Sequence, residues 1–188
     1  MDTHSTEELH NRLKLVRGNL PPNRLFKLIE AFNSTAEIFN ASTQQLQNTG
    51  LSDEQIDRLQ NINTADVDRD LAWLENTGHG IVFYDDPAYP QKLLEIDDPA
   101  YALFYIGDLD YLQQPQLAIV GSRSPSARGK QIAEDFADHL SNAGPTITSG
   151  LAYGLDSASP KAAVNAYAGT TSVVANGLHR LYPTSNTP

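Results

Sequence analysis

A polar loop with a glycine at each end follows the apolar residues 117–120 and leads into a sequence with helical periodicity. The loop begins with Gly121, Ser122 and Arg123 and ends at Gly129. Glycine lets backbone N–H groups approach an anion closely, and the planar guanidinium of an arginine matches phosphate oxygens. A helix that begins after such a loop adds the positive end of its dipole. The stretch therefore predicts a phosphate site.

Two later loops are of the same type and follow further strand-like runs. Residues 149–156 ("SGLAYGLD") follow the run 146–148, and residues 176–183 ("NGLHRLYP") follow the run 171–175. Ligands of parallel sheets bind outside the carboxyl ends of the strands, so the three loops are expected to converge. Several residues in and beside these loops could bind an anion through a backbone N–H, a hydroxyl or a positive charge. They are Gly150, Gly154, Gly177, Ser149, Lys161 and Arg180.

Other chemistries find less support. The loops do not match G-x-G-x-x-G, and no G-x-x-x-x-G-K-[ST] pattern occurs in the sequence. Ser149, Asp156 and His179 have the residue types of a catalytic triad, but no G-x-S-x-G pattern accompanies them. The histidines lack ligand spacing and cysteine is missing, so we expect no metal site. The residues alone favour phosphate binding over purely structural loops, and both interpretations stay open.

The charge of the chain is unevenly distributed. The net charge is −10, with 8 Lys and Arg against 19 Asp and Glu in residues 1–114, and 5 against 4 in residues 115–188. Most nucleic-acid-binding proteins are basic, so this distribution permits a local phosphate site but not a broad basic face. The acidic pairs at 85–86 and 97–98 each precede a proline, which favours solvated turn residues over a metal or acid–base site.

The sequence predicts two segments of different secondary structure. Short helices are expected in residues 1–77, with helix starts marked by Ser34, Ser52 and Thr64. The later segment, residues 78–188, alternates apolar runs with helical patterns, which is typical of an α/β fold with a parallel sheet. Strands are expected at 81–84, 102–106, 117–120, 146–148 and 171–175.

The helix after the 121–129 loop has an apolar stripe. Its period predicts that one face, turned to the core, carries Ile132, Ala133, Phe136, Ala137 and Leu140. Apolar runs of the ~20 residues that span a bilayer do not occur, and the N-terminus is polar and acidic, unlike a secretory signal. A cytoplasmic protein without membrane contact is therefore expected.

Four stretches in order along the chain are specific when taken together: "YPQKLLEIDDPAYALFYIGD", "AIVGSRSPSARG", "SGLAYGLDSAS" and "NGLHRLYPTSN". They resemble the DNA-processing protein A family (DprA, also called Smf), and the resemblance covers essentially residues 10–188. It implies an extended, mostly parallel Rossmann-like sheet, preceded by a small all-helical domain that is SAM-like or helix-hairpin-helix-like. It also implies a DNA-binding protein rather than an enzyme, so no catalytic residue and no cofactor are expected.

The resemblance further implies binding of single-stranded DNA during natural transformation, protection of the incoming strand and assistance in loading the RecA recombinase. A homodimer formed through the Rossmann-like domain is expected. The DNA site implied by motif position consists of Arg123, Ser149, Gly150, Asn176, Gly177 and Arg180, with Lys161 as a weaker match. Gly121 and Ser122 complete the predicted site.

Three departures from the family pattern matter. Ser159 and Pro160 stand where the family usually has Ala-His, which predicts a helix with Ser159 as N-cap and Pro160 in first position. His179 stands where the family usually has Asp. The sequence stops at Pro188, whereas a full family domain continues, so we expect a fragment that lacks the C-terminal part.

Two alternatives to the DNA-binding interpretation remain. One is a small-nucleotide-binding Rossmann-like protein, either a phosphoribohydrolase-like enzyme or a nucleotide sensor. That class carries a "PGGxGTxxE" motif, and this chain has "NAYAGTTSVV" instead. The other alternative is a folding or interaction module. Tyr153 and Tyr182, which lie in the predicted loops, are candidates for stacking on bases.

Overall fold

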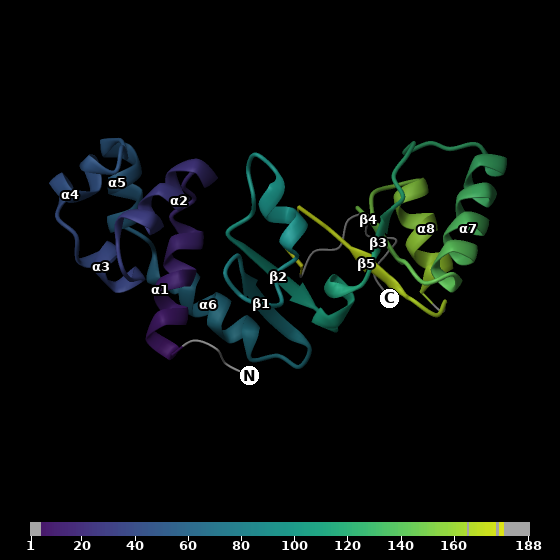
Figure 1. Ribbon diagram of the computed structural model, residues 1–188, viewed down its shortest axis with the longest axis horizontal. Coiled ribbons are helices and arrows are strands. Elements are labelled where there is room, and N and C mark those ends of the chain that lie inside the picture. Colours follow the sequence, from purple (N-terminus) through teal and green to yellow (C-terminus); the bar gives the residue numbers. More distant parts are fainter. Residues whose placement is uncertain (1–4, 165, 176, 179–188) are drawn as a thin grey trace. The chain divides into compact units, whose positions relative to one another are not determined.

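Six helices precede the first strand in the computed structural model, which describes residues 5–164, 166–175, 177 and 178 (Figure 1). The chain divides into two compact units, and each is described by itself. Unit 1 comprises residues 1–85 and 91–104, and unit 2 comprises residues 86–90 and 105–188. The helices of unit 1 are α1 (Thr6–Arg17), α2 (Pro22–Ala31), α3 (Thr35–Asn40), α4 (Thr43–Asn48), α5 (Asp53–Gln60) and α6 (Thr64–Leu74).

Short polar side chains begin most of these helices. The predicted caps Ser34 and Ser52 are confirmed, because each side-chain oxygen accepts the N–H three residues on. Ser42 starts α4 with a complete capping box, which the sequence analysis did not identify. The prediction for α6 was wrong by one residue, since the cap is Asn63 and Thr64 is the first helical residue. Asparagine accepts the free N–H groups of a helix start better than threonine does.

Strands β1 (His79–Phe83) and β2 (Ala102–Ile106) pair in a two-stranded sheet, close to the predicted positions. Phe83 and Tyr101 are buried in the same apolar core as the helices. The other buried members of that core are Leu15, Leu20, Leu25, Leu28, Ile38, Leu46, Leu51, Ile56 and Leu59. The core of unit 1 thus includes residues that follow α6 by up to 27 positions, so the unit does not end where its helices end.

An ion pair ties α1 to the end of β1. The guanidinium of Arg12 donates to both carboxylate oxygens of Asp85, at 2.6 and 2.7 Å, and to Glu8 at 2.8 Å. The side chain of Arg12 is only 12% exposed and its guanidinium lies 4.9 Å from the ring centroid of Phe83. A guanidinium withdrawn from water needs carboxylate partners. Asp85, expected as a solvated turn residue, therefore has a structural role.

Three parallel strands form the sheet of unit 2, in the order β3 (Gln116–Ala118), β4 (Thr146–Ser149) and β5 (Thr170–Ser172). Leu117 lies beside Ile147, and Ile147 lies beside Thr170. This order confirms the predicted α/β fold with a parallel sheet. The described elements also include two short 3-10 helices, η1 (Gln91–Glu95) in unit 1 and η2 (Leu109–Gln113) in unit 2. Two longer α-helices belong to unit 2.

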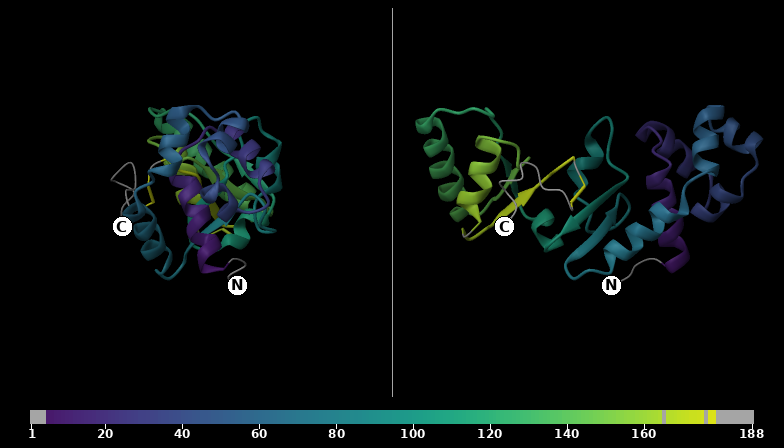
Figure 2. Two further views of the ribbon diagram at one scale, coloured as in Figure 1. Left: turned by 90° about the vertical axis from the view of Figure 1, so that its left-hand side faces the viewer. Right: turned by 180° about the vertical axis from the view of Figure 1, so that it is seen from behind.

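The two long helices of unit 2 are α7 (Ala127–Asn142) and α8 (Leu155–Ala163). They lie side by side against one face of the sheet (Figures 1 and 2). Ala137, Ile147 and Ala163 are fully buried at the centre of their contact. The predicted apolar stripe of α7 is only partly in the core, because Ile132 and Phe136 are exposed. The small side chain of Ala137 lets α7 approach its neighbours closely along a narrow face, which leaves the two larger residues outside.

The prediction for the start of α8 was wrong. The helix begins at Leu155, and Pro160 lies inside it. Ser159 is not the N-cap but is buried, and its hydroxyl donates to the Leu155 carbonyl at 3.1 Å. The Leu155 N–H donates to the carbonyl of Ser122 at 3.2 Å, so a contact with the preceding loop fixes the first turn. A tertiary contact of this kind outweighs the local preference of a Ser-Pro pair.

Candidate nucleic-acid interface

The loops that follow β3 and β4 meet at the carboxyl edge of the unit 2 sheet. Gly154 has a φ of +86°, and a Cβ placed on it would lie 2.2 Å from the carbonyl oxygen of Ser122 and 2.8 Å from the backbone of Arg123. Any side chain at Gly154 would collide with this backbone. The glycine therefore permits direct backbone contact between the first loop and the start of α8.

The third predicted loop falls mostly outside the described residues. Asn176 and Arg180, two of the predicted site residues, lie outside them, as does His179. Gly177 is described and exposed. The geometry of the site therefore comes from the first two loops, which carry the predicted site residues Gly121, Ser122, Arg123, Ser149 and Gly150.

A carboxylate already occupies part of the predicted anion site. The N–H of Gly121 donates to Oδ1 of Asp156 at 3.0 Å, and a Cβ on Gly150 would lie 3.2 Å from Oδ2 of the same side chain. Asp156 lies in the first turn of α8, where the helix dipole favours a negative charge. Asp156, a possible triad member by residue type, instead accepts the N–H of Gly121, and no local pattern in the sequence points to that partner.

The two serines of the predicted site hydrogen-bond within the protein. Ser149 is buried, and its hydroxyl donates to the carbonyl of Ile119 at 2.6 Å, across the ends of β4 and β3. The hydroxyl of Ser122 accepts the N–H of Ser124 at 3.1 Å and so shapes the loop. Both side chains hold the loops in position rather than extend from them.

Arg123 is the predicted cation that the structure does bring to this edge. It is exposed, it follows Ser122 in the first loop, and its backbone touches Gly154. The ion pairs of the described residues do not include Arg123. Tyr153, half exposed at 47%, precedes Gly154 in the second loop. An arginine and an aromatic ring therefore extend from adjoining loops.

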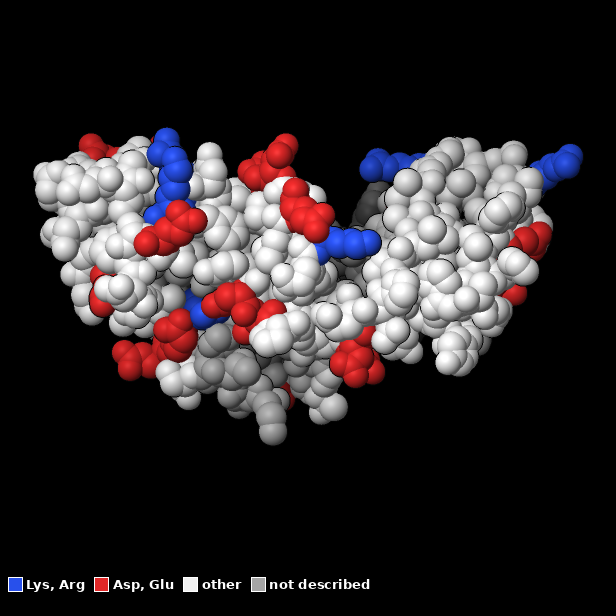
Figure 3. Space-filling model, viewed as in Figure 1, with Lys and Arg blue, Asp and Glu red and all other residues white. Residues whose placement is uncertain are grey.

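Lys161 is not brought to this edge. It is exposed in the last turn of α8, whereas the loops meet the first turn of that helix. On the side shown in Figure 3, acidic side chains are scattered over unit 1, and the basic side chains of both units are isolated rather than gathered. The described residues of this face therefore form no broad basic surface.

The described residues contain no group of three or more His, Cys, Asp or Glu side chains arranged to hold a metal ion. Among the described helices, none combines the length and the apolar character that a membrane crossing requires.

Comparisons with known proteins match this arrangement to one family. The family model described as DNA recombination-mediator protein A matches residues 80–188. Protein Smf of Escherichia coli is 38% identical over 138 residues, which are 73% of this chain and 37% of that protein. The DNA processing protein DprA of Streptococcus pneumoniae is 42% identical over 101 residues, 54% of this chain and 36% of that protein.

The X-ray structure of DNA processing protein A from Streptococcus pneumoniae has the same fold. It superimposes with a TM-score of 0.74 at 29% identity, over 95% of this chain and 62% of that one. The present chain thus spans little more than a third of the length of the two curated relatives. The family match covers more than half of the chain and includes both loops of the interface. The chain therefore belongs to the DNA recombination-mediator protein A family, which confirms the resemblance seen in its sequence.

Proposed function

We propose that this chain binds single-stranded DNA through its phosphates, at the sheet edge where the loops after β3 and β4 meet. The observation that carries the proposal is the backbone contact of Gly154 with Ser122 and Arg123, which joins two loops and leaves the Arg123 side chain exposed beside them. The names of the relatives, DNA processing protein and DNA recombination-mediator protein, support the same class of ligand.

Physical reasons favour a single strand over a duplex. An arginine on a glycine-rich turn contacts phosphates without reading bases. An aromatic side chain such as Tyr153 stacks on any base, and only an unpaired strand exposes the faces of its bases. A duplex offers its phosphates to an extended basic surface, whereas the basic side chains on the face shown in Figure 3 are isolated. The site therefore suits a flexible strand with little sequence preference.

The wider role proposed for the protein is that of the DprA type. It would act without catalysis, protect incoming single-stranded DNA, and assist a RecA-type recombinase in natural transformation. A cytoplasmic homodimer formed through the Rossmann-like segment, residues 78–188, belongs to the same proposal. Gly121, Ser122, Ser149 and Gly150 would shape the phosphate site, and Asn176, Gly177 and Arg180 would extend it. Lys161, in the last turn of α8, would take no part in it.

For residues 1–77 we propose a SAM-like domain that makes protein contacts rather than DNA contacts. The acidic excess of residues 1–114, 19 Asp and Glu against 8 Lys and Arg, disfavours contact with a polyanion. The stretch "VRGNLPPN", which contains the turn from α1 to α2, holds one glycine, where a DNA-binding helix-hairpin-helix turn needs two for close backbone approach.

A three-way titration tests the proposal. The 188-residue chain is titrated with a labelled oligothymidylate, with a blunt duplex of equal length and with thymidine monophosphate, and binding is followed by fluorescence anisotropy and by competition. We expect the single strand to bind most tightly and the mononucleotide not to compete at micromolar concentration. Equal affinity for strand and duplex would overturn the proposal. Competition by the mononucleotide would favour a small-nucleotide site instead.

A further inference from the structure

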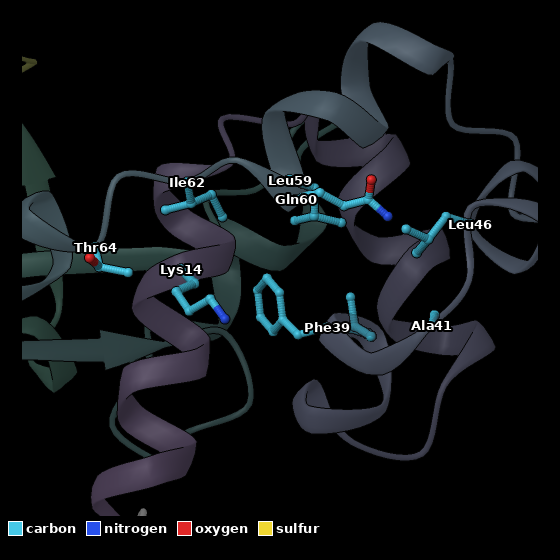
Figure 4. A pocket seen from close by; sticks show the side chains of 9 residues that line it. Lys14, Phe39, Ala41, Leu46, Leu59, Gln60, Ile62 and Thr64 are labelled. Carbon is cyan, nitrogen blue, oxygen red and sulfur yellow. The ribbon is translucent and has the colours of Figure 1, made fainter.

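A cavity of about 210 Å³ lies in unit 1, between α1, α3 and the segment that joins α5 to α6 (Figure 4). Six of its nine lining residues are apolar, and polar and apolar atoms contribute in similar measure to the surface that faces the cavity. The residues that line it are Lys14, Ile38, Phe39, Ala41, Leu46, Leu59, Gln60, Ile62 and Thr64. Typical pockets for drug-sized ligands measure ~300–1,000 Å³, so this cavity fits a smaller molecule of about ten non-hydrogen atoms.

Lys14 is the one cation among these lining residues. Its side chain extends from α1 toward the ring of Phe39, and the amine lies 3.7 Å from the ring centroid (Figure 4). Glutamate and aspartate do not occur among the residues that line the cavity. Burial lowers the pKa of the Lys14 amine below its ordinary value, because the charged form loses solvation there.

Two neighbouring cations of α1 have carboxylate partners. Arg12 is bound by Asp85 and Glu8, and Arg17 is bound by both carboxylate oxygens of Asp70. Among the ion pairs of the described residues, none involves Lys14. A half-buried amine with only a ring beside it gains more from an added anion than an exposed amine does.

We infer that this cavity binds a small molecule that carries one carboxylate on an apolar group. The carboxylate would accept hydrogen bonds from the Lys14 amine, and the apolar group would lie against Phe39, Leu46 and Ile62. We propose a ligand with a single negative charge because residues 1–114 carry a large acidic excess, and this excess repels a polyanion such as DNA. This site is independent of the DNA-binding proposal, which concerns unit 2.

Such chemistry has two sources, a free aryl- or alkylcarboxylate and the C-terminal carboxylate of a peptide with an apolar last residue. The probe for the first is 3-phenylpropionate, and its matched control is 3-phenylpropionamide, which has the same shape without the charge. The probe for the second is the tripeptide Gly-Gly-Phe with a free C-terminus, compared with its C-terminal amide. A preference for one acid probe over the other identifies the source.

The experiment follows the methyl and lysine side-chain signals of the 188-residue chain by NMR during titration with each probe. We expect saturable shifts at Ile38, Leu46 and Ile62, with each acid binding roughly tenfold more tightly than its amide. Lys14→Met should bring the acid-to-amide ratio to about one, because the apolar walls bind both probes alike. Lys14→Arg should retain a preference for the acid. Lys27→Met, which removes a lysine of α2 that does not line the cavity, should leave the ratio unchanged.

Three outcomes would overturn the inference. They are equal binding of acid and amide, an unchanged ratio in Lys14→Met, and the lack of saturable shifts at millimolar probe. The ¹H–¹⁵N spectrum of each variant checks its fold. If Lys14→Met does not fold, the comparison of acid with amide on the parent chain and on Lys14→Arg still decides the question.

Discussion

The backbone N–H of Gly121, which follows β3, donates to the side chain of Asp156, in the first turn of α8, at 3.0 Å. The residues are 35 positions apart in the sequence. The carboxylate of Asp156 holds the first loop against the second. It also places a negative charge at the edge where we propose that phosphates bind. These two effects act in opposite directions on DNA affinity.

Substitution of Asp156 separates the two effects. Asp156→Asn keeps an oxygen that accepts from Gly121 but removes the charge, whose repulsion of a phosphate is worth about 1 kcal/mol at ~4 Å in water. We expect this variant to bind single-stranded DNA roughly fivefold more tightly than the parent chain.

Asp156→Ala provides the matched comparison. It removes the charge and the acceptor together, so the first loop is no longer held, and it should bind single-stranded DNA more weakly than Asp156→Asn does. Fluorescence anisotropy at one salt concentration measures both affinities. Affinity in Asp156→Asn equal to that of the parent would show that the charge does not act on the ligand.

Arg123 is expected to bind one phosphate. Arg123→Ala should weaken binding to all single-stranded sequences by similar factors and reduce the log–log salt slope by roughly 0.7, the value per neutralised phosphate. Arg123→Lys should restore only part of the affinity, because an ammonium cannot form a bidentate fork. Thermal stability should change little, since the side chain is exposed. Titrations at several salt concentrations provide the slopes.

Arg58 provides the matched control for Arg123. It lies on α5 of unit 1 and makes a loose i,i+4 pair with Glu54 at 3.9 Å. Arg58→Ala should leave both affinity and slope unchanged. A drop in melting temperature for Arg123→Ala without a change of slope would make Arg123 a structural residue.

Gly154→Ala tests the contact between the loops. The variant combines the strain of a positive φ with a collision against the Ser122 carbonyl. Gly144 is the control, because it also has a positive φ (+127°), but a Cβ there would meet no heavy atom of the described residues within 4 Å. We expect Gly144→Ala to cost about 1–3 kcal/mol of unfolding free energy, and Gly154→Ala to cost a further ~1–3 kcal/mol from overpacking. Urea unfolding measures the difference, and equal losses would rule out the collision.

High pH should destabilise unit 1 through Tyr101. Burial raises the pKa of its hydroxyl above the ordinary value of 10.0. Well below pH 10 the tyrosine is protonated in both the folded and the unfolded chain, so it adds no pH dependence. Above pH 10 the unfolded chain loses the proton first, which lowers the free energy of unfolding as the pH rises.

Tyr101→Phe is the variant that checks this effect. It should flatten the decline in unfolding free energy above pH 10. Urea unfolding followed by circular dichroism across this pH range provides the comparison. An identical decline in the parent and in Tyr101→Phe would assign the effect to other tyrosines.

The parallel sheet was predictable because its strands are apolar runs that alternate with helical patterns. The order β3-β4-β5 follows from such alternation with short connections. The start of α8 was not predictable, because the contact of Leu155 with Ser122 fixes it across 33 positions, while the local signal at Pro160 pointed to a later start. The period of 3.6 residues likewise predicted the apolar stripe of α7. It did not predict that Ile132 and Phe136 of this stripe would lie outside the core that contains Ala137.

The candidate site was predictable in part, because glycine and arginine on a turn between a strand and a helix indicate a phosphate site without knowledge of distant contacts. The convergence of the first two loops followed from the parallel topology. The role of Asp156 was not predictable, since whether a carboxylate points toward a loop or into solvent depends on packing between distant residues. The buried hydroxyl of Ser149 was missed for the same reason.

The closure of unit 1 by late residues has a consequence for its synthesis on the ribosome. A nascent chain that has emerged as far as Leu74 contains the six described α-helices of the unit but lacks Phe83, Asp85 and Tyr101. Its apolar core is then incomplete and Arg12 lacks its bidentate partner. At ~5–20 residues per second, the missing residues arrive seconds later. The apolar faces of the N-terminal helices therefore remain partly exposed until the two strands have been synthesised.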